Sequence, residues 1–175
     1  MKKLLIASLC TTAVFLTACD KKSNDQVKDN GTVTTPEKTA SLSTNVNADI
    51  QHDLNLLDQI SNTKAQEALA FQTEVTKAAQ NNNKAELDSV VDKMDEYVDR
   101  FNDDLDKLAL KSTEGVALRD KMKETNDLGL DLAKAGIKEK PDMNEINELQ
   151  QKAVTLQQSL IQDMQSLKTK VENKS

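Results

Sequence analysis

The stretch LDSVVDKMDEYVDRFNDDLDKL, residues 87–108, decides the fold. Its apolar residues recur at alternating intervals of four and three, a heptad spacing that places them on one face of an α-helix. The members of this stripe are Leu87, Val91, Met94, Val98, Phe101, Leu105 and Leu108. Most of the residues between them are charged. The pattern predicts an amphipathic helix that buries one face against other helices.

Three further apolar stripes with helical spacing flank this stretch, over residues 50–78, 118–132 and 146–171. Their members are Ile50, Leu54, Leu57, Ala68, Phe71, Val75 and Ala78; Leu118, Met122, Thr125, Gly129 and Leu132; and Ile146, Leu149, Ala153, Leu156, Leu160, Met164, Leu167 and Val171. A helix begins best after a residue whose side chain accepts hydrogen bonds from its first free amides, and several such residues lie between the stripes. The candidates are Asn45 or Asn47 for the first helix, Ser112 for the third, and Asp142 or Asn144 for the fourth, with Asn81, Asn82 and Asn83 ending the first.

Four amphipathic helices joined by short connections predict an all-α fold, an antiparallel up-down four-helix bundle over residues 45–175. The alternative is a three-helix bundle with a long fused second helix, because only a loss of phase at residues 111–115 and one capping residue separate the second and third stripes. The composition agrees with either bundle. Aromatic residues make up 2% of the chain, fewer than a sheet protein needs.

Residues 19–44 differ in composition from the helical part. They are rich in Ser, Thr, Asn, Asp and Lys, contain Gly31 and Pro36, and carry almost no large apolar residues. Such a segment buries too little apolar surface to offset the entropy of ordering it. We therefore predict a disordered tether between the amino terminus and the bundle.

The first residues have the architecture of a secretory signal peptide. Lys2 and Lys3 precede an apolar run, residues 4–16, that is shorter than the about 20 residues a helix needs to span a bilayer. The run ends in Leu16-Thr17-Ala18-Cys19, which resembles the lipobox of bacterial lipoproteins. The resemblance implies that residues 1–18 are removed as a signal peptide. It also implies diacylglycerol on the Cys19 sulfur and a further acyl chain, such as palmitate, on the new amino terminus.

The lipobox also implies where the protein resides and what it contacts. Two or more acyl chains anchor a protein stably, so the membrane itself is the first partner, and the bundle is expected to face the periplasm of the cell envelope. Asp20 after the lipidated cysteine favours the inner membrane in enteric bacteria, whereas other lineages sort by different rules, so both membranes stay open. The formal charge of −6 argues against nucleic acid as a partner, because phosphates require basic residues.

The sequence offers little material for catalysis or for a cofactor. His52, the one histidine, lies two residues from both Ile50 and Leu54, so it is expected to face solvent; a haem held by His52 and Met164 is therefore disfavoured. The Glu-x-x-His motif of di-iron bundles is absent from the sequence, and residues 102–107 carry Lys where a calcium loop needs Gly. We predict no catalytic residue, no metal and no cofactor.

Two further groups of residues have alternative interpretations. Met94, Met122, Met143 and Met164 are expected to fill gaps in the core rather than to form an adaptable binding surface. The second helix is densely acidic, and most of this charge is expected to be a solvated helix face. If the bundle uses charge for recognition, Asp95, Asp99 and Asp103 are the candidate contacts to a basic envelope protein.

These features predict a lipid-anchored lipoprotein of the cell envelope that is not an enzyme and has a binding, scaffolding or chaperone-like role. One alternative is a carrier of an apolar ligand, which requires a cavity between the helices lined by Leu and Met. Another is an enzyme that uses paired carboxylates, which requires two acids that converge in a cleft. The structure distinguishes these by what lines the space between the helices.

The lipobox gives a prediction that mass spectrometry checks. Protein extracted from membranes with detergent should begin at Cys19 and should carry the mass of the attached acyl chains. An unmodified Cys19, or a chain that still begins at Met1, would contradict the prediction. Cys19→Ser should release the protein from the membrane fraction, because the tether and bundle supply no other anchor of comparable strength.

Overall fold

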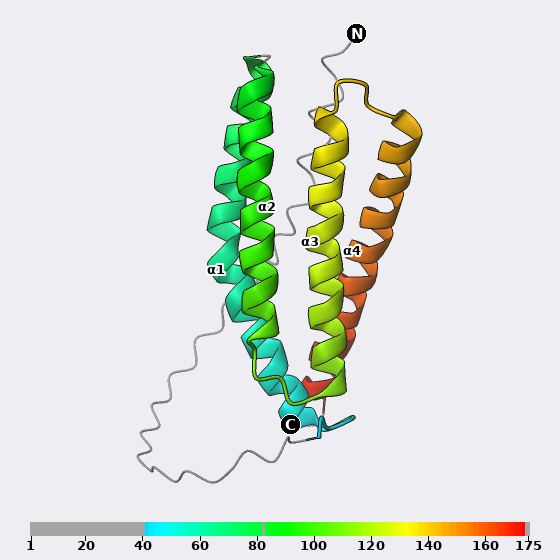
Figure 1. The fold of residues 1–175 in the computed structure, drawn as a ribbon. Coiled ribbons are helices and arrows are strands. Elements are labelled where there is room, and N and C mark those ends of the chain that lie inside the picture. Colours follow the sequence, from blue (N-terminus) through cyan, green and yellow to red (C-terminus); the bar gives the residue numbers. More distant parts are fainter. Residues whose placement is uncertain (1–40, 82, 174–175) are drawn as a thin grey trace, which may run out of the picture.

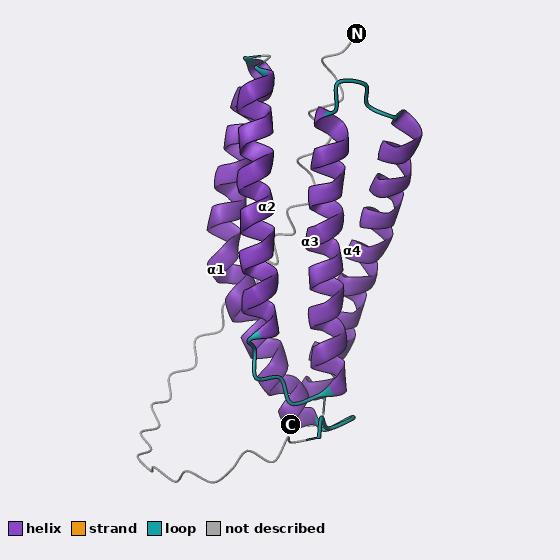
Figure 2. Cartoon of the chain, in the orientation of Figure 1, coloured by secondary structure: helices purple, strands orange, loops and turns teal. Residues whose placement is uncertain are grey.

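The computed structural model describes residues 41–81 and 83–173. They form four α-helices: α1 (Asn47–Gln80), α2 (Lys84–Asp106), α3 (Thr113–Ile137) and α4 (Met143–Glu172). Consecutive helices run in opposite directions, and α4 packs against both α3 and α1, which closes the ring (Figure 1). The predicted all-α four-helix bundle is confirmed. A loop separates α2 from α3, so the fused-helix alternative is wrong (Figure 2).

The two ends of the bundle are built differently, and we name them by their connections. At the closed end, the start of α1, the loop between α2 and α3, and the end of α4 come together (Figure 1). At the opposite end, the hairpin end, lie the turn between α1 and α2 and the loop between α3 and α4. The chain therefore consists of two helical hairpins that are joined at the closed end.

Two of the predicted caps are confirmed and a third was missed. Ser112 accepts a hydrogen bond from the amide of Gly115 at the start of α3, and Asp142 accepts one from the amide of Asn144 at the start of α4. Asn83, which had been expected only to end the first helix, caps α2. These side chains satisfy amides that have no partner within their own helix.

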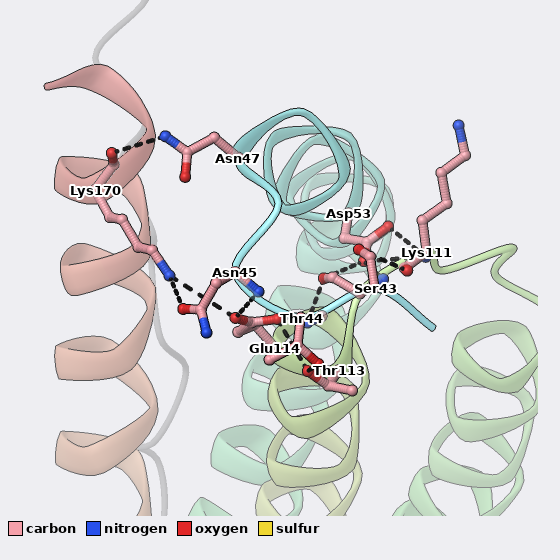
Figure 3. Close-up of polar contacts among 11 residues, drawn as sticks. Ser43, Thr44, Asn45, Asn47, Asp53, Lys111, Thr113, Glu114 and Lys170 are labelled. Carbon is pink, nitrogen blue, oxygen red and sulfur yellow. Dashed lines mark hydrogen bonds and ion pairs between the residues drawn. The ribbon is translucent and has the colours of Figure 1, made fainter. Parts of the chain in front are cut away.

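The prediction that Asn45 or Asn47 caps the first helix is wrong. The residue before α1 is Val46, which offers no side-chain cap, and Asn45 has a φ of 61°. Both asparagines bind the neighbouring helices instead (Figure 3): the Asn45 amide donates to Glu114 at 2.8 Å, Lys170 donates to the Asn45 side chain at 2.6 Å, and Asn47 donates to the Lys170 carbonyl at 3.4 Å. The backbone N–H of Asn45 thus ties the start of α1 to α3, and the side chains of Asn45 and Asn47 tie it to α4.

The boundary between tether and bundle also needs a correction. The predicted signal peptide, Cys19 and most of the predicted tether lie outside the described residues. Ser43, assigned to the tether, is bonded to the bundle: its amide donates to the Lys111 carbonyl at 2.8 Å, and its carbonyl accepts from the Thr113 amide at 2.9 Å. The folded unit thus includes residue 43 rather than beginning at 45. Composition could not reveal this, because the contacts are backbone hydrogen bonds to a loop distant in sequence.

The predicted stripes face inward, but their burial changes along the bundle. Near the closed end the large apolar side chains are fully buried: Ile50, Leu54, Leu57, Leu105 and Leu118. Toward the hairpin end several members of the same stripes are only half-buried: Ala68, Phe71, Val75, Leu87 and Met94. The helices are therefore tightly packed at one end and leave space between them toward the other.

A buried carboxylate holds the closed end together. Asp53 of α1 has 0% of its surface exposed. Its two oxygens accept hydrogen bonds from the amide of Lys111 at 2.9 and 3.1 Å, from the amide of Ser112 at 2.8 Å and from the Ser112 hydroxyl at 2.6 Å. Figure 3 shows Asp53 pointing from α1 to the backbone at Lys111. We call Asp53, Lys111, Ser112 and Gly115 the Asp53 cluster.

Gly115 belongs to this cluster because α3 approaches Asp53 very closely. A Cβ atom at residue 115 would lie 2.3 Å from the nearer Asp53 carboxylate oxygen, a distance that atoms without a bond do not adopt. Asp53 cannot move aside without losing its hydrogen bonds to the loop. Position 115 therefore requires glycine, although it lies within a helix, where glycine is unfavourable. Gly129 of α3 is the opposite case, because a Cβ there would meet nothing within 4 Å.

The two glycines give a matched pair of substitutions. Gly115→Ala should lower the free energy of unfolding by about 2–4 kcal/mol, because it overpacks the cluster and breaks buried hydrogen bonds. Gly129→Ala should raise it by about 0.5–1 kcal/mol, because it improves helix propensity without a clash. Urea unfolding followed by circular dichroism measures both. Equal effects at the two positions would mean that the Asp53 cluster does not constrain α3.

Candidate functional site

A cavity of about 290 Å³ lies between the four helices, beyond the tightly packed leucines of the closed end. All four helices line it, and most of the lining is apolar, including Phe71 of α1, Met94 of α2, Leu130 of α3 and Leu160 of α4. Its volume is close to the lower limit for small-molecule sites, about 300 Å³. The space is therefore large enough for a ligand and lined in a way that favours an apolar one.

Small residues at inward-facing positions create this space. The cavity lining includes Ala65, Ala68, Gly129, Ala133, Gly136 and Ala153. Ala68, Gly129 and Ala153 were predicted to lie on the apolar stripes. Their place in the cavity lining confirms that prediction. They face inward, but their side chains are too short to reach across the bundle.

Three aromatic side chains form one wall of the cavity. The rings of Phe71 and Tyr97 are 5.2 Å apart, and those of Tyr97 and Phe101 are 6.0 Å apart, in tilted contacts. The chain has only one further aromatic residue, Phe15, which lies in the predicted signal peptide. The aromatic residues of the bundle are thus concentrated at the cavity.

Tyr97 has a buried hydroxyl with one defined partner. It donates to the carbonyl of Lys64 at 3.1 Å, which ties α2 to α1. Burial raises the pKa of Tyr97 from its ordinary value of 10.0 to about 12, and the carboxylate of Glu67 adds to the rise. The hydroxyl therefore stays protonated at neutral pH and acts as a donor within the wall.

The methionines are divided between the cavity and the surface. Met94, Met122 and Met164 line the cavity. Met143, at the start of α4, is 39% exposed. The expectation that all four fill gaps in the core is wrong for Met143, which precedes the first buried residue of α4, Ile146, and is exposed. The other three border a gap that they do not fill, where their flexible side chains supply an adaptable wall.

The lining of the cavity distinguishes the alternatives drawn from the sequence. Among the described side chains that border it, none is a carboxylate or an imidazole. A shallower hollow on the outer side of α3 and α4 includes Glu124 and Glu148, but both are exposed. Water around exposed carboxylates removes the low-dielectric surroundings that tune such groups for acid–base chemistry. The interhelical space therefore has the apolar lining that the carrier alternative requires.

Comparison with known proteins adds the family. The family model described as "Uncharacterised lipoprotein PM1805" matches residues 51–172, which is more than half of the chain. The chain belongs to this lipoprotein family. The resemblance seen in the lipobox is thereby confirmed at the level of the class, and a lipoprotein is anchored at a membrane of the cell envelope. No curated protein and no solved structure matches the chain.

Two features of the lipoprotein's described residues concern membranes and metals. None of the helices in 41–81 and 83–173 is long and apolar enough to cross a membrane. Within the same residues, no three His, Cys, Asp or Glu side chains converge as metal ligands would.

His52 is half-buried rather than fully solvated and does not line the cavity, whereas Met164 does. The structure does not bring the two candidate haem ligands together at this site.

The three acidic residues predicted to bind a partner lie on α2, outside the cavity. Asp95 is already paired within the lipoprotein, with Lys134 of α3 at 2.8 Å, and this contact raises the pKa of Lys134. Asp99 and Asp103 are exposed. A contact to a basic envelope protein stays a prediction, and Asp99 and Asp103 are the residues with which to test it. Substitution of Asp95 would also break an interhelical ion pair.

The single tyrosine makes its environment directly measurable. Phenolate absorbance of the folded protein should titrate with a midpoint near pH 12, against about 10 for the unfolded chain. Because the unfolded chain loses this proton first, stability should be unaffected below about pH 10 and should fall as the pH rises toward 12. In Tyr97→Phe this part of the alkaline loss should disappear. A midpoint near 10 in the folded protein would contradict the buried position of the hydroxyl.

Proposed function

We propose that this lipoprotein is a non-catalytic binding protein of the cell envelope that holds an apolar ligand between its helices. The observation that supports the proposal is the cavity of about 290 Å³ with its apolar lining. In this proposal the acyl chains on Cys19 attach the bundle to the membrane, and the bundle faces the periplasm. Binding is preferred to scaffolding because the notable feature lies inside the bundle rather than on its surface.

The energetics of packing support a bound ligand. Enclosed cavities in protein cores cost about 24 cal/mol per Å³; this space is partly open to solvent, so about 7 kcal/mol is the upper limit of the cost of leaving it empty. That is comparable with the whole stability of a typical domain, about 5–15 kcal/mol. A bound apolar molecule restores contacts that the surrounding side chains lack. An engineered apolar cavity of only about 150 Å³ already binds benzene.

Small residues at the cavity support the same function. Leucine at positions such as Gly129 would improve helix propensity and fill the space, at a position where a Cβ meets nothing within 4 Å. A bundle that served only as a rigid spacer would gain stability from such residues. The small side chains keep the space open at the expense of stability, as expected for a binding site.

Methionine methyl groups report on cavity occupancy with an internal control. The test uses the chain from residue 19 onward with Cys19→Ser, which carries no acyl chain of its own, labelled at the methionine methyls. Titration with benzene should shift the signals of Met94, Met122 and Met164, which line the cavity, and should leave exposed Met143 unchanged. Benzene is small enough to enter whatever the shape of the natural ligand.

A graded series at one position completes the test. Gly129→Ala, Gly129→Val and Gly129→Leu should progressively weaken the benzene-induced shifts, because the larger side chains occupy the cavity. Thermal unfolding shows that each variant is folded. Shifts of similar size at all four methionines, or undiminished shifts in Gly129→Leu, would refute the proposed function.

A further inference from the structure

The cavity is elongated along the helices. Its lining extends from Ser61 to Val75 on α1 and from Leu87 to Phe101 on α2. At 1.5 Å per residue, each of these segments is about 21 Å long. All four helices contribute lining residues along this length, so a single extended aliphatic chain can lie parallel to the helices and contact each of them.

The two ends of the cavity differ in polarity. Toward the hairpin end its lining is mostly apolar, with the uncharged Gln72 and Gln157 among Val75, Leu87, Val91, Ile137 and Ala153. Nearer the middle of the bundle the lining includes Lys64 and Asn126. These two residues lie at one level, because α2 joins both: Asp104 pairs with Lys64, and Asn102 accepts from Asn126 at 3.0 Å. The site thus combines a mostly apolar slot with a polar end that carries the one charged side chain among the described residues of the lining, which is the distribution expected for an amphiphile.

Lys64 is the charged side chain at the polar end. Only 12% of it is exposed, and its ammonium group lies 3.1 Å from the carboxylate of Asp104. An ammonium group has three donors, so this pair leaves others for a ligand. Asp104 also has a second cation, Lys107 at 3.4 Å, which is 72% exposed and does not line the cavity. The carboxylate is thus partly neutralised from outside, while Lys64 remains beside the cavity.

We propose that the ligand is a single-chain aliphatic amphiphile with an anionic head, such as a fatty acid or a lysophospholipid. Its tail lies in the slot toward Ile137, and its head meets Lys64. This assignment of ligand class rests on the proposed function. A compact or polycyclic molecule would contact only part of this length, and an amphiphile with a cationic head would meet the ammonium group of Lys64.

The first test compares the shapes of two carboxylates. It uses the same Cys19→Ser chain, with binding measured by calorimetry below the concentration at which the probes form micelles. Dodecanoate should bind once per chain, and adamantane carboxylate, which is compact, should bind at least about tenfold more weakly. Dodecanoate should shift the signals of Met94, Met122 and Met164, and Gly129→Leu should lower its affinity at least about tenfold. Equal affinity for the two carboxylates would overturn the assignment of a linear chain.

The second test examines the head group with matched variants. Lys64→Met should weaken dodecanoate binding by about tenfold, the effect of losing one charge-assisted hydrogen bond, and should leave dodecanol binding unchanged. Lys93→Met removes an exposed cation of α2 that pairs with Glu74 and does not line the cavity, and it should change neither affinity. If Lys64→Met and Lys93→Met act alike, the head does not bind at Lys64. The ligand could come from free fatty acids or from membrane lipids, and a lysophospholipid with the same dodecanoyl chain distinguishes the two. Tighter binding of dodecanoate identifies a free fatty acid, and tighter binding of the lysophospholipid identifies a membrane lipid.

The outcomes separate this inference from the proposed function. If benzene shifts the cavity methyl signals and dodecanoate does not, the ligand class is wrong while the cavity still binds apolar molecules. If neither probe acts on those signals, the proposed function itself fails.

Discussion

The bundle depends on a buried carboxylate that is satisfied by a loop. Asp53 is fully buried, and its hydrogen bonds come from the backbone at Lys111 and Ser112 and from the Ser112 hydroxyl. Burying a charge without such partners would be very costly, so α1 and the α2–α3 loop are stable only together. The carboxylate also lies at the amino terminus of α3, where the helix dipole favours negative charge. Ser112 links the carboxylate to the helix. Its hydroxyl donates a hydrogen bond to Asp53, and its oxygen accepts one from the amide of Gly115.

This constraint explains why the two ends of the bundle differ. Fixing the loop against α1 brings the two hairpins together at the closed end, where Leu54, Leu57 and Leu118 are fully buried. Ser43, Asn45 and Asn47 add hydrogen bonds at the same end. Toward the hairpin end, the two hairpins are connected through side chains, and several of the inward-facing positions are Ala or Gly. The cavity follows from small residues on helices whose relative position is already fixed elsewhere.

Helical periodicity predicted much of the fold but little of the site. The apolar stripes gave the number of helices and their inward faces, and Ser112 and Asp142 marked two helix starts, because these signals are local in sequence. The Asp53 cluster joins residues 59 positions apart. Its one local sign is an acidic residue between Ile50 and Leu54 on the first stripe. Periodicity shows which side chains face inward but not how much of the interior they fill. Ala68 and Gly129 were therefore assigned correctly to the interior, but their spacing could not show that a cavity lies beside them.

The choice of side chains around the cavity completes the argument. A tightly packed core is best served by Leu and Ile, whose rotamers are well defined, and the closed end uses them. The cavity is bordered instead by Met94, Met122 and Met164, which adapt to an irregular partner, and by an aromatic wall in which Tyr97 is held by its hydrogen bond to Lys64. That hydrogen bond fixes the backbone at Lys64, whose ammonium group is the charged donor at the polar end. Rigid packing at the closed end thus fixes the helices, while an adaptable lining and a fixed polar contact surround the space between them.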